Sequence, residues 1–367
     1  MHIKTLKLQN FRNYEDARFV LDPAVNLICG ENGQGKTNLL EAAAACSTMR
    51  LFRTAQKKEG LRFGEDAAFI CSEFEAQGRE NTLELRLSRL RAMEIYKNGV
   101  RQKRQSDVQG LLKTVLFCPE DLMLVRAGAA ARRRFLDTAL CQLRPNYARY
   151  LEEYNRLHEH KTRILRDSEE YPSLLDTLPE FDLRMAQSGA VIIYYRARFC
   201  ERLKEYAGIA HRECSGGREE LGVEYQTVST ISDPLAPIET IYDQLRAHQA
   251  SHAAAERASR MCLSGPHKDD IAVTIGGVNA RQFSSQGQTR TAALAFKLAE
   301  REIYREITSR TPLLLLDDVL SELDPKRQEY VLNRISGGQV FITCCEEDRL
   351  GTLLSGKVFH ISQGAVV

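Results

Sequence analysis

One octapeptide limits what this chain can fold into more than any other feature of its sequence. Residues 30–37 read GENGQGKT, which matches the phosphate-loop pattern G-x-x-x-x-G-K-[ST]. The apolar residues 25–29 predict a buried strand before the loop, and residues 37–45 (TNLLEAAAA) predict a helix after it. In that context the backbone N–H groups and the helix N-terminus point at a bound phosphate. A chance glycine-rich turn is the alternative, and the flanking strand and helix disfavour it.

The loop also contains the residues that are expected to bind the nucleotide. Its glycines let the backbone approach phosphate oxygens closely, Lys36 reaches the β- and γ-phosphates, and the Thr37 hydroxyl ligates Mg²⁺. Lys36 is therefore expected to act in catalysis as well as in binding. Arg12 and Asn13, close upstream, are expected to help hold the nucleotide. The predicted ATP-binding residues within the loop are Gly30, Glu31, Asn32, Gly33, Gln34, Gly35, Lys36 and Thr37.

Composition narrows the class of protein. The 367 residues exceed one typical domain, so two lobes are expected. The net charge of +2 does not by itself indicate a protein that binds nucleic acid, so any surface that binds nucleic acid must be a local basic patch. The ten cysteines follow no disulfide or CxxC spacing, which favours reduced thiols in the cytoplasm. With no signal peptide and no long apolar run, a soluble intracellular protein without a membrane partner is expected.

The hydrophobic pattern divides the chain into three parts. Residues 1–127 predict the first part of an ATPase domain: alternating strands at 2–8, 17–21, 67–76, 82–88 and 93–96, a hairpin turn at Asn98-Gly99, and a strand at 115–118. Residues 128–262 predict an inserted helical arm, with helices at 129–143, 146–166, 181–207 and 238–259 separated near Pro172, Pro179, Pro234 and Pro237. Residues 263–367 return to the ATPase domain, with strands at 271–275, 313–316 and 340–343 and a helix from about 284 to 308. The predicted fold is α/β: a P-loop ATPase lobe of the ABC type, with a mixed sheet and an antiparallel sub-sheet, carrying an inserted helical arm.

Two acids follow the buried strand at residues 313–316. Asp317 and Asp318 would lie at the carboxyl end of a parallel strand, where doubly wound sheets hold ligands. Asp317 is assigned to the Mg²⁺ shell, and Asp318 is assigned to orient or deprotonate the attacking water. A Glu is more often found at the second position, so the shorter Asp318 predicts slow hydrolysis.

A third segment points to a composite site. Residues 284–288 (SSQGQ) precede the helix before the acidic strand, where an ABC-type ATPase carries its LSGGQ signature. Ser285, Gly287 and Gln288 match that pattern, while Ser284 and Gln286 depart from it, and a plain helix start is the alternative. Ser321 and Asp324 fit the D-loop that such ATPases place across a dimer interface. Ser285, Gln286, Gly287 and Gln288 are therefore expected to act in trans, in a two-fold dimer around two ATP molecules.

Together these segments resemble the RecF family, within the larger group that contains ABC, SMC and Rad50 ATPases. The resemblance covers essentially the whole chain and is most specific at residues 8–14 (LQNFRNY), 117–122 (FCPEDL), 132–137 (RRRFLD) and 263–270 (LSGPHKDD). It implies an ATP- and Mg²⁺-dependent DNA-binding protein of repair, replication and recombination in the DNA-damage (SOS) response. Such proteins dimerise on ATP, hydrolyse it slowly with stimulation by DNA, and act with RecO and RecR to bring RecA onto gapped single-stranded DNA. The implied location is the cytoplasm, on the nucleoid.

The chain departs from the wider ABC pattern at two places. Residues 343–345 (Thr-Cys-Cys) stand where many ABC ATPases carry a His, and no lid Gln is evident, with Glu120 as a candidate for its place.

DNA contact is expected from a local basic cluster around the predicted hairpin. A phosphate-tracking face and a charged, solvated sheet edge both fit this cluster. The candidates are Arg86, Arg89, Arg91, Lys97, Arg101, Lys103 and Arg104. In the run Arg132-Arg133-Arg134, at least one Arg is expected to pair with a carboxylate such as Asp121 or Asp137.

Two other points stay open at this stage. Residues 267–270 (HKDD) are interpreted as an interlobe turn in preference to a metal site, because no second His cluster supplies further ligands. A protein of a different class also fits the nucleotide motifs, namely an ABC-type engine that works on a protein partner in defence or transport.

Overall fold

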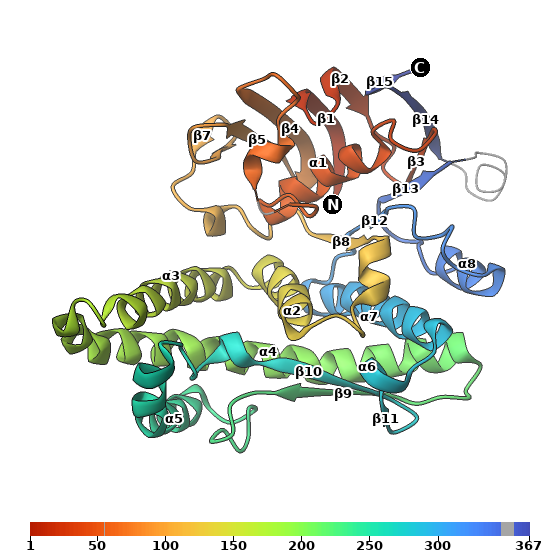
Figure 1. Ribbon diagram of the computed structural model, residues 1–367. Helices are drawn as coiled ribbons and strands as arrows, with labels where there is room; N and C mark the ends of the chain where they lie inside the picture. Colours follow the sequence, from red (N-terminus) through yellow and green to blue (C-terminus); the bar gives the residue numbers. More distant parts are fainter. Residues whose placement is uncertain (55, 346–355) are drawn as a thin grey trace. The chain divides into compact units, whose positions relative to one another are not determined.

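The structure is a computed structural model that describes residues 1–54, 56–345 and 356–367 (Figure 1). It divides into two compact units. The first joins Met1–Met123 to Ala293–Val367, and the second is the continuous stretch Leu124–Ala292. The second unit therefore runs past the predicted arm boundary at residue 262, because the strand predicted at 271–275 pairs with a strand of the arm.

A largely parallel six-stranded sheet forms one half of the first unit. Its inner strands are short and almost completely buried, as expected for a sheet covered on both faces. In spatial order the strands are β15 (Ala365–Val366), β14 (Lys357–Ser362), β3 (Val25–Cys29), β13 (Val340–Cys344), β12 (Leu313–Leu316) and β8 (Thr114–Phe117). Only β15 is antiparallel to its neighbour, so the carboxyl ends of β3, β13 and β12 meet at one edge.

An antiparallel six-stranded sheet forms the other half of this unit. Its strands are β2 (Tyr14–Val20), β1 (His2–Phe11), β4 (Ala67–Ala76), β5 (Arg79–Ser88), β6 (Glu94–Lys97) and β7 (Val100–Arg101). The predicted turn at Asn98-Gly99 joins β6 to β7, and both residues have positive φ (49° and 77°), as a type I′ turn requires. The predicted strands are confirmed, and the mixed and antiparallel sheets agree with the predicted fold class.

Helix α1 (Lys36–Thr48) contacts both sheets, with β4 and β5 on one side and β8 and β13 on the other. It is buried along nearly its whole length, and four consecutive alanines at 42–45 let both sheets approach it closely. A single hydrophobic cluster links this helix to the inner faces of both sheets. The helix that follows the phosphate loop is therefore the centre of the first unit.

The second unit is built on long helices, as predicted. They are α2 (Ala129–Leu143), α3 (Pro145–Asp167), α4 (Leu178–Ser215) and α5 (Ile238–Ser259), with the short α6 (Ala280–Phe283) and the start of α7 (Gln286–Thr308). Helix α4 is longer than expected at both ends. It starts earlier because Pro179 lies in its first turn, where a missing N–H costs nothing. None of the described helices is long and apolar enough to cross a membrane.

A small sheet in this unit combines the strand predicted at 271–275 with two strands that the sequence did not predict. Strand β9 (Leu221–Gln226) pairs with β10 (Asp270–Ile275), which pairs in turn with β11 (Val278–Asn279). The remaining short elements are α8 (Pro325–Leu332) and the 3₁₀ turns η1 (Lys57–Gly60), η2 (Gln105–Asp107), η3 (Pro119–Met123), η4 (Pro172–Thr177) and η5 (Pro266–Lys268).

Buried charges hold the second unit together where β10 meets the helices. Arg196 on α4 bonds both Asp137 on α2 (2.8 Å) and Asp269 (3.0 Å), and Tyr225 and Thr227 donate to the same Asp269 carboxylate. Burial raises the pKa of Asp269 to about 6, although these partners oppose the shift. Arg196, Asp137 and Asp269 thus all have hydrogen-bonded partners of opposite charge, which offsets the cost of burying them.

One arginine of the run at 132–134 pairs with a carboxylate, as predicted, but the carboxylate is neither of the two examples named from the sequence. Arg132 is 3% exposed and bonds Asp270 through two nitrogens (2.6 and 2.8 Å), while Arg133 donates to the Asp269 carbonyl oxygen (2.6 Å). The carboxylate of Asp137, one of the expected partners, instead accepts from Arg196 of α4. His267 bonds the Tyr154 hydroxyl and the Cys262 carbonyl. Among the described residues, no group of three or more His, Cys, Asp or Glu side chains is placed to hold a metal.

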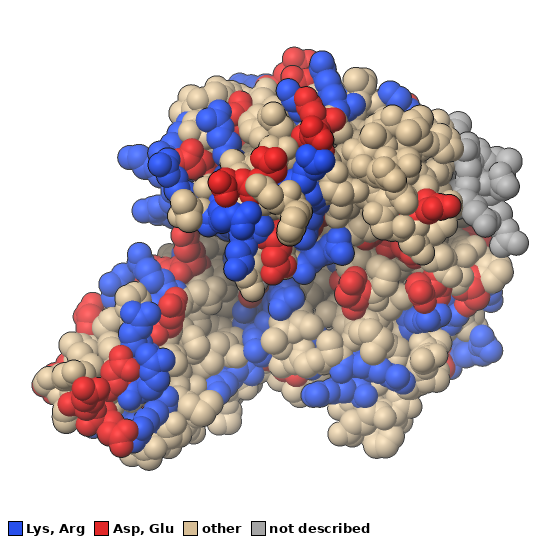
Figure 2. Space-filling view, turned by 45° about the horizontal axis from the view of Figure 1, so that its top comes forward, with Lys and Arg blue, Asp and Glu red and all other residues tan. Residues whose placement is uncertain are grey.

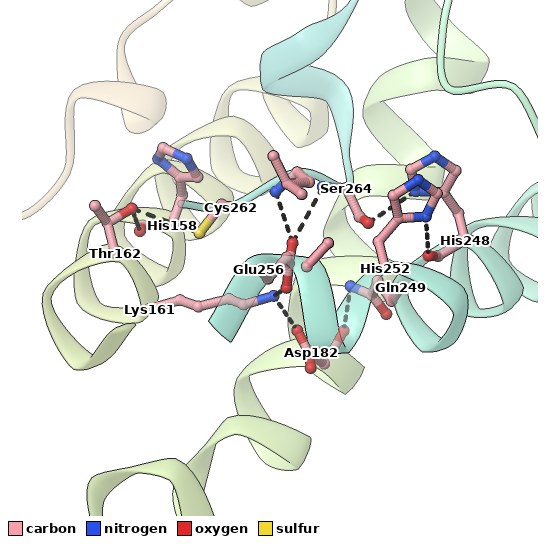
Figure 3. Close-up of polar contacts among 12 residues, drawn as sticks. His158, Lys161, Thr162, Asp182, His248, Gln249, His252, Glu256, Cys262 and Ser264 are labelled. Atoms are coloured by element: carbon pink, nitrogen blue, oxygen red, sulfur yellow. Dashed lines mark hydrogen bonds and ion pairs between the residues drawn. The ribbon is translucent and has the colours of Figure 1, made fainter. Parts of the chain in front are cut away.

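A second buried ion cluster joins α3, α4 and α5 (Figure 3). The Lys161 ammonium, 1% exposed, bonds the carboxylates of Asp182 (2.6 Å) and Glu256. Burial alone would lower the pKa of Lys161, but its two carboxylate partners raise it above its ordinary value. Glu256 also accepts from the backbone N–H groups of Leu263 (2.7 Å) and Ser264 (3.2 Å), so the cluster fixes the chain as it leaves α5.

Lys161→Met should therefore lower the free energy of unfolding by about 3–5 kcal/mol, because the buried Glu256 and the half-buried Asp182 lose the cation that they share. Urea unfolding of the variant and the parent chain measures this difference. Lys4→Met is the matched control, since the Lys4–Glu80 pair is exposed and screened by solvent, and its loss should leave the unfolding transition close to that of the parent chain. Equal losses in the two variants would contradict the stabilising role of the cluster.

Candidate nucleotide site

The phosphate loop lies between β3 and α1, as the motif requires. Gly30 and Gly35 have φ of 148° and 121°, in the region that favours glycine. A Cβ on Gly30 would lie 2.4 Å from the Ile361 carbonyl oxygen, and one on Gly35 would lie 2.7 Å from the Asn13 side chain. Glycine is needed at both positions for conformation and for space.

The Lys36 ammonium is folded back onto the loop. It donates to the carbonyl oxygens of Gly30 (2.5 Å) and Glu31 (3.0 Å) and lies 3.6 Å from the Cys345 thiol. That thiol is 3.2 Å from the Asn32 side-chain oxygen. The loop backbone therefore wraps around the charged end of the lysine, which the structure places at the centre of the predicted residues.

Two of the predicted ligands brace the loop through their own side chains. Asn13 donates to the Gln34 carbonyl oxygen (2.7 Å) and accepts from Asn38 of α1 (2.8 Å). Arg12 bonds the buried Glu41 of α1 with two nitrogens (2.8 and 3.1 Å) and the Glu59 carbonyl with a third. Their expected role in holding the nucleotide remains a prediction.

The C-terminal hairpin also supports the loop, which sequence reasoning missed. In the turn between β14 and β15, the Gln363 N–H donates to the Gln34 side chain (2.7 Å) and the Gly364 N–H donates to the Gln34 carbonyl (3.0 Å). A Cβ on Gly364 would lie 2.3 Å from the Asn13 carbonyl oxygen. A Gln-Gly turn near the chain end carries no signal of this contact, because the pairing of β14 with β3 creates it.

Three strands bring the predicted metal ligands together. The Thr37 hydroxyl donates to an Asp317 carboxylate oxygen (2.9 Å), and the Thr343 hydroxyl on β13 donates to the same oxygen (3.0 Å). Burial raises the pKa of Asp317; the nearby charges of Asp318 and Glu120 act in the same direction, and the two hydroxyl bonds oppose them. Because burial and the neighbouring acids destabilise the charged form of this carboxylate, a bound cation would stabilise it strongly.

These residues fit Mg²⁺. A hydroxyl and a carboxylate oxygen are the hard ligands this ion accepts, and it commonly takes one or two protein ligands together with substrate phosphates. Thr37 and Asp317 would hold it.

Asp318 adopts a left-handed backbone conformation (φ 51°), which turns the chain sharply after β12. Its N–H donates to the Thr343 hydroxyl (2.7 Å), and the Ser321 hydroxyl donates to its carboxylate (3.0 Å) and its carbonyl oxygen (2.6 Å). Thr343 thus contacts both acids and is a site residue that the sequence did not reveal. Its position was visible only as a departure from the expected His.

The predicted D-loop residues lie next to these acids. Ser321 contacts Asp318, and Asp324 is the N-cap of α8, where its carboxylate accepts from the Arg327 N–H (3.1 Å) and side chain. The candidate lid residue Glu120 is exposed in η3, and its charge reaches Asp317.

The signature segment lies in the second unit, at the N-terminus of α7. Ser285 is exposed and precedes the helix, whose first residues are Gln286, Gly287 and Gln288. The Gln288 N–H donates to the Ser285 hydroxyl oxygen (3.2 Å), and the Ser285 N–H donates to the Gln288 side chain (2.7 Å). This reciprocal arrangement is a capping box, so the segment is an ordered helix start.

The candidate DNA-contact residues are less uniformly basic in space than in sequence. Arg86, Arg89 and Arg101 pair with Glu84 (3.0 Å), Asp66 (2.9 Å) and Glu94 (2.9 Å). The face drawn in Figure 2 shows acidic side chains interspersed among the basic ones. The other candidates are Arg91, Lys97, Lys103 and Arg104, and both interpretations of this edge stay open.

Comparison with known proteins identifies the family that the chain is similar to. A protein-family model described as RecF/RecN/SMC N terminal domain matches residues 2–362. The chain is 38% identical over 370 residues to the DNA replication and repair protein RecF of Agathobacter rectalis, covering 100% of this chain and 99% of that protein. It is 34% identical over 368 residues to the protein of the same name from Clostridium perfringens, with the same coverage.

Solved structures of the same family and of the same fold are also similar to this chain. A structure described as the recombination mediator protein RecF-ATP in the RecFOR pathway matches with a TM-score of 0.92 and 33% identity, covering 100% of this chain and 97% of that chain. The Smc head domain of Pyrococcus furiosus matches with a TM-score of 0.56 at 14% identity, covering 100% and 95%, and shows the shared fold. A family model that spans nearly the whole chain, with relatives above 30% identity along their full length, shows that this chain belongs to the RecF family.

Proposed function

We propose that this chain is an ATP-dependent DNA-binding protein of recombinational repair and replication-fork maintenance. ATP drives two copies to dimerise on duplex DNA or on single/double-strand junctions, and slow, DNA-stimulated hydrolysis releases them. The chain acts in the cytoplasm with RecO and RecR to load RecA at single-stranded gaps. Support comes from its full-length RecF relatives and from the match to a structure described as RecF-ATP in the RecFOR pathway.

The observation that carries the ATP-dependent part is the contact of Thr37 with Asp317 beside Lys36. Lys36 exchanges its carbonyl partners for phosphate oxygens. Thr37 and Asp317 would hold Mg²⁺, which would neutralise phosphate charge. Asp318 accepts a hydrogen bond from the attacking water and orients it. Ser321 and Thr343 hold Asp318 in the left-handed turn that this role needs.

The dimer completes each site. Ser285, Gly287 and the N-terminus of α7 from one copy face the triphosphate in the phosphate loop of the other. In the capping box the Ser285 oxygen accepts from the Gln288 N–H, so the hydroxyl hydrogen is the group offered to a phosphate oxygen. Phosphate contacts from the basic edge around β5, β6 and β7 supply sequence-independent DNA affinity.

Lys36→Ala should weaken ATP binding at least about tenfold, because a charge-assisted bond to phosphate is lost. Titration with a fluorescent ATP analogue measures the dissociation constant. Lys4→Ala, an exposed lysine on β1, is the control and should bind as the parent chain does. Unchanged affinity in Lys36→Ala would remove the phosphate-loop assignment.

Thr343→Val should lower the turnover number for ATP about 10- to 100-fold while ATP affinity stays close to that of the parent chain. The isosteric change removes the hydroxyl that positions Asp317 and Asp318, and small misplacements at a reacting centre reduce rates strongly. Steady-state turnover at saturating ATP–Mg²⁺ is the measurement. Thr343→Ser keeps the hydroxyl and should retain most of the rate; a slow Ser variant beside a fast Val variant would contradict this role.

Ser285→Arg should leave ATP binding intact and abolish ATP-dependent dimerisation, since a bulky cation replaces the hydroxyl at the interface. Light scattering without nucleotide, with ATP–Mg²⁺, and with ATP–Mg²⁺ and duplex DNA tests this variant and the proposed function together. The parent chain should double its mass with ATP and stay on DNA. Ser259→Arg, the same change on the exposed end of α5, should behave as the parent does.

A parent chain of constant mass that retains no DNA would instead favour an engine that works on a protein partner.

A further inference from the structure

Helix α7 begins with a side chain whose two polar ends are both engaged. The Gln288 amide oxygen accepts from the Ser285 N–H (2.7 Å), which is half of the capping box. The Gln288 amide nitrogen donates to a carboxylate oxygen of Glu219 (2.7 Å). Glu219 belongs to none of the segments discussed so far.

The backbone around Glu219 is held by the turn that joins α4 to β9. Gly216 and Gly217 take positive φ (68° and 77°) and reverse the chain. The next carbonyl, that of Glu220, accepts from the Gly276 N–H (2.8 Å) at the start of the β9–β10 pairing. Glu219 therefore reaches Gln288 from a position that the sheet determines, independently of α7.

The chemistry of the pair dictates the orientation of the amide. An ionised carboxylate only accepts hydrogen bonds, so the NH₂ end of Gln288 must face Glu219. The oxygen end must then face Ser285, where the capping box requires an acceptor. Without Glu219 the amide is able to rotate by half a turn, which would set a donor against the Ser285 N–H and open the box.

We propose that Glu219 is a positioning residue for the signature segment: it fixes the amide of Gln288 and, through it, the hydroxyl of Ser285 and the N-terminus of α7. The inference rests on the proposed function, in which this helix start meets the triphosphate held by a second copy. Residues upstream of Ser285 are held separately, because Ser284 bonds Arg126 and Thr289. Glu219 thus acts on the signature residues themselves.

The test compares Glu219→Ala with Glu219→Gln in the full-length chain. The Gln variant loses the charge but keeps an oxygen that accepts from Gln288, whereas the Ala variant loses the acceptor. Glu220→Ala is the matched control: it removes the same charge one residue away, from an exposed side chain. Light scattering across a concentration series gives the dissociation constant of the ATP-dependent dimer, and a fluorescent ATP analogue at low protein concentration gives monomer affinity.

Glu219→Ala should weaken the dimer about tenfold, the effect of one lost hydrogen bond to a charged group, with monomer ATP affinity unchanged. Glu219→Gln and Glu220→Ala should dimerise within about twofold of the parent chain. In a double-mutant cycle, Glu219→Ala should add nothing to Gln288→Ala, because the first acts through the second. Thermal unfolding midpoints should coincide among the variants, which separates positioning from general destabilisation.

A Glu219→Ala variant that dimerises like the parent, a Gln variant as impaired as Ala, or additive effects in the cycle would each overturn the inference alone. A parent chain that stays monomeric with ATP would overturn the proposed function, and this inference with it.

Discussion

The Thr343 hydroxyl connects the parts of the nucleotide site that the chain supplies from distant places. It donates to Asp317 and accepts from the Asp318 N–H, while Thr37 reaches the same Asp317 oxygen from the phosphate loop. This geometry exists because β13 lies between β3 and β12 in the parallel sheet. Without that strand between them, the loop and the acid pair would not share one edge.

The phosphate loop is held from both of its sides by groups outside the motif. Asn13 and the turn at Gln363-Gly364 both bond Gln34, and the buried Glu41 on α1 is neutralised by Arg12. These contacts join the first hairpin and the last hairpin of the chain to one loop. A loop whose carbonyls and glycines are fixed in advance loses less conformational freedom when it binds a triphosphate.

In the second unit, buried ion pairs hold the long charged helices in one arrangement. Two buried clusters do so, one around Arg196 and Asp269 and one around Lys161, Asp182 and Glu256. Both contact the chain after α5: the first contains Asp269, and in the second Glu256 accepts from the N–H groups of Leu263 and Ser264. The capping box of Ser285 and Gln288, with Glu219 beside it, continues this organisation up to the helix start that the proposed dimer uses.

The sequence by itself determined the phosphate loop, most of the strands and long helices, and the order of the acid pair and the signature, because these depend on local periodicity and on short motifs. It could not identify Thr343, the Gln363-Gly364 turn, strand β9 or the partners of Arg132, since each depends on which strands and helices become neighbours. Asp137 was an acceptable partner for the arginine run at 132–134 by charge and by distance along the chain, yet in the structure its carboxylate accepts from Arg196 of α4. Tertiary structure decided these contacts, because a buried polar group forms its hydrogen bonds with the groups that the packing of helices and strands places next to it.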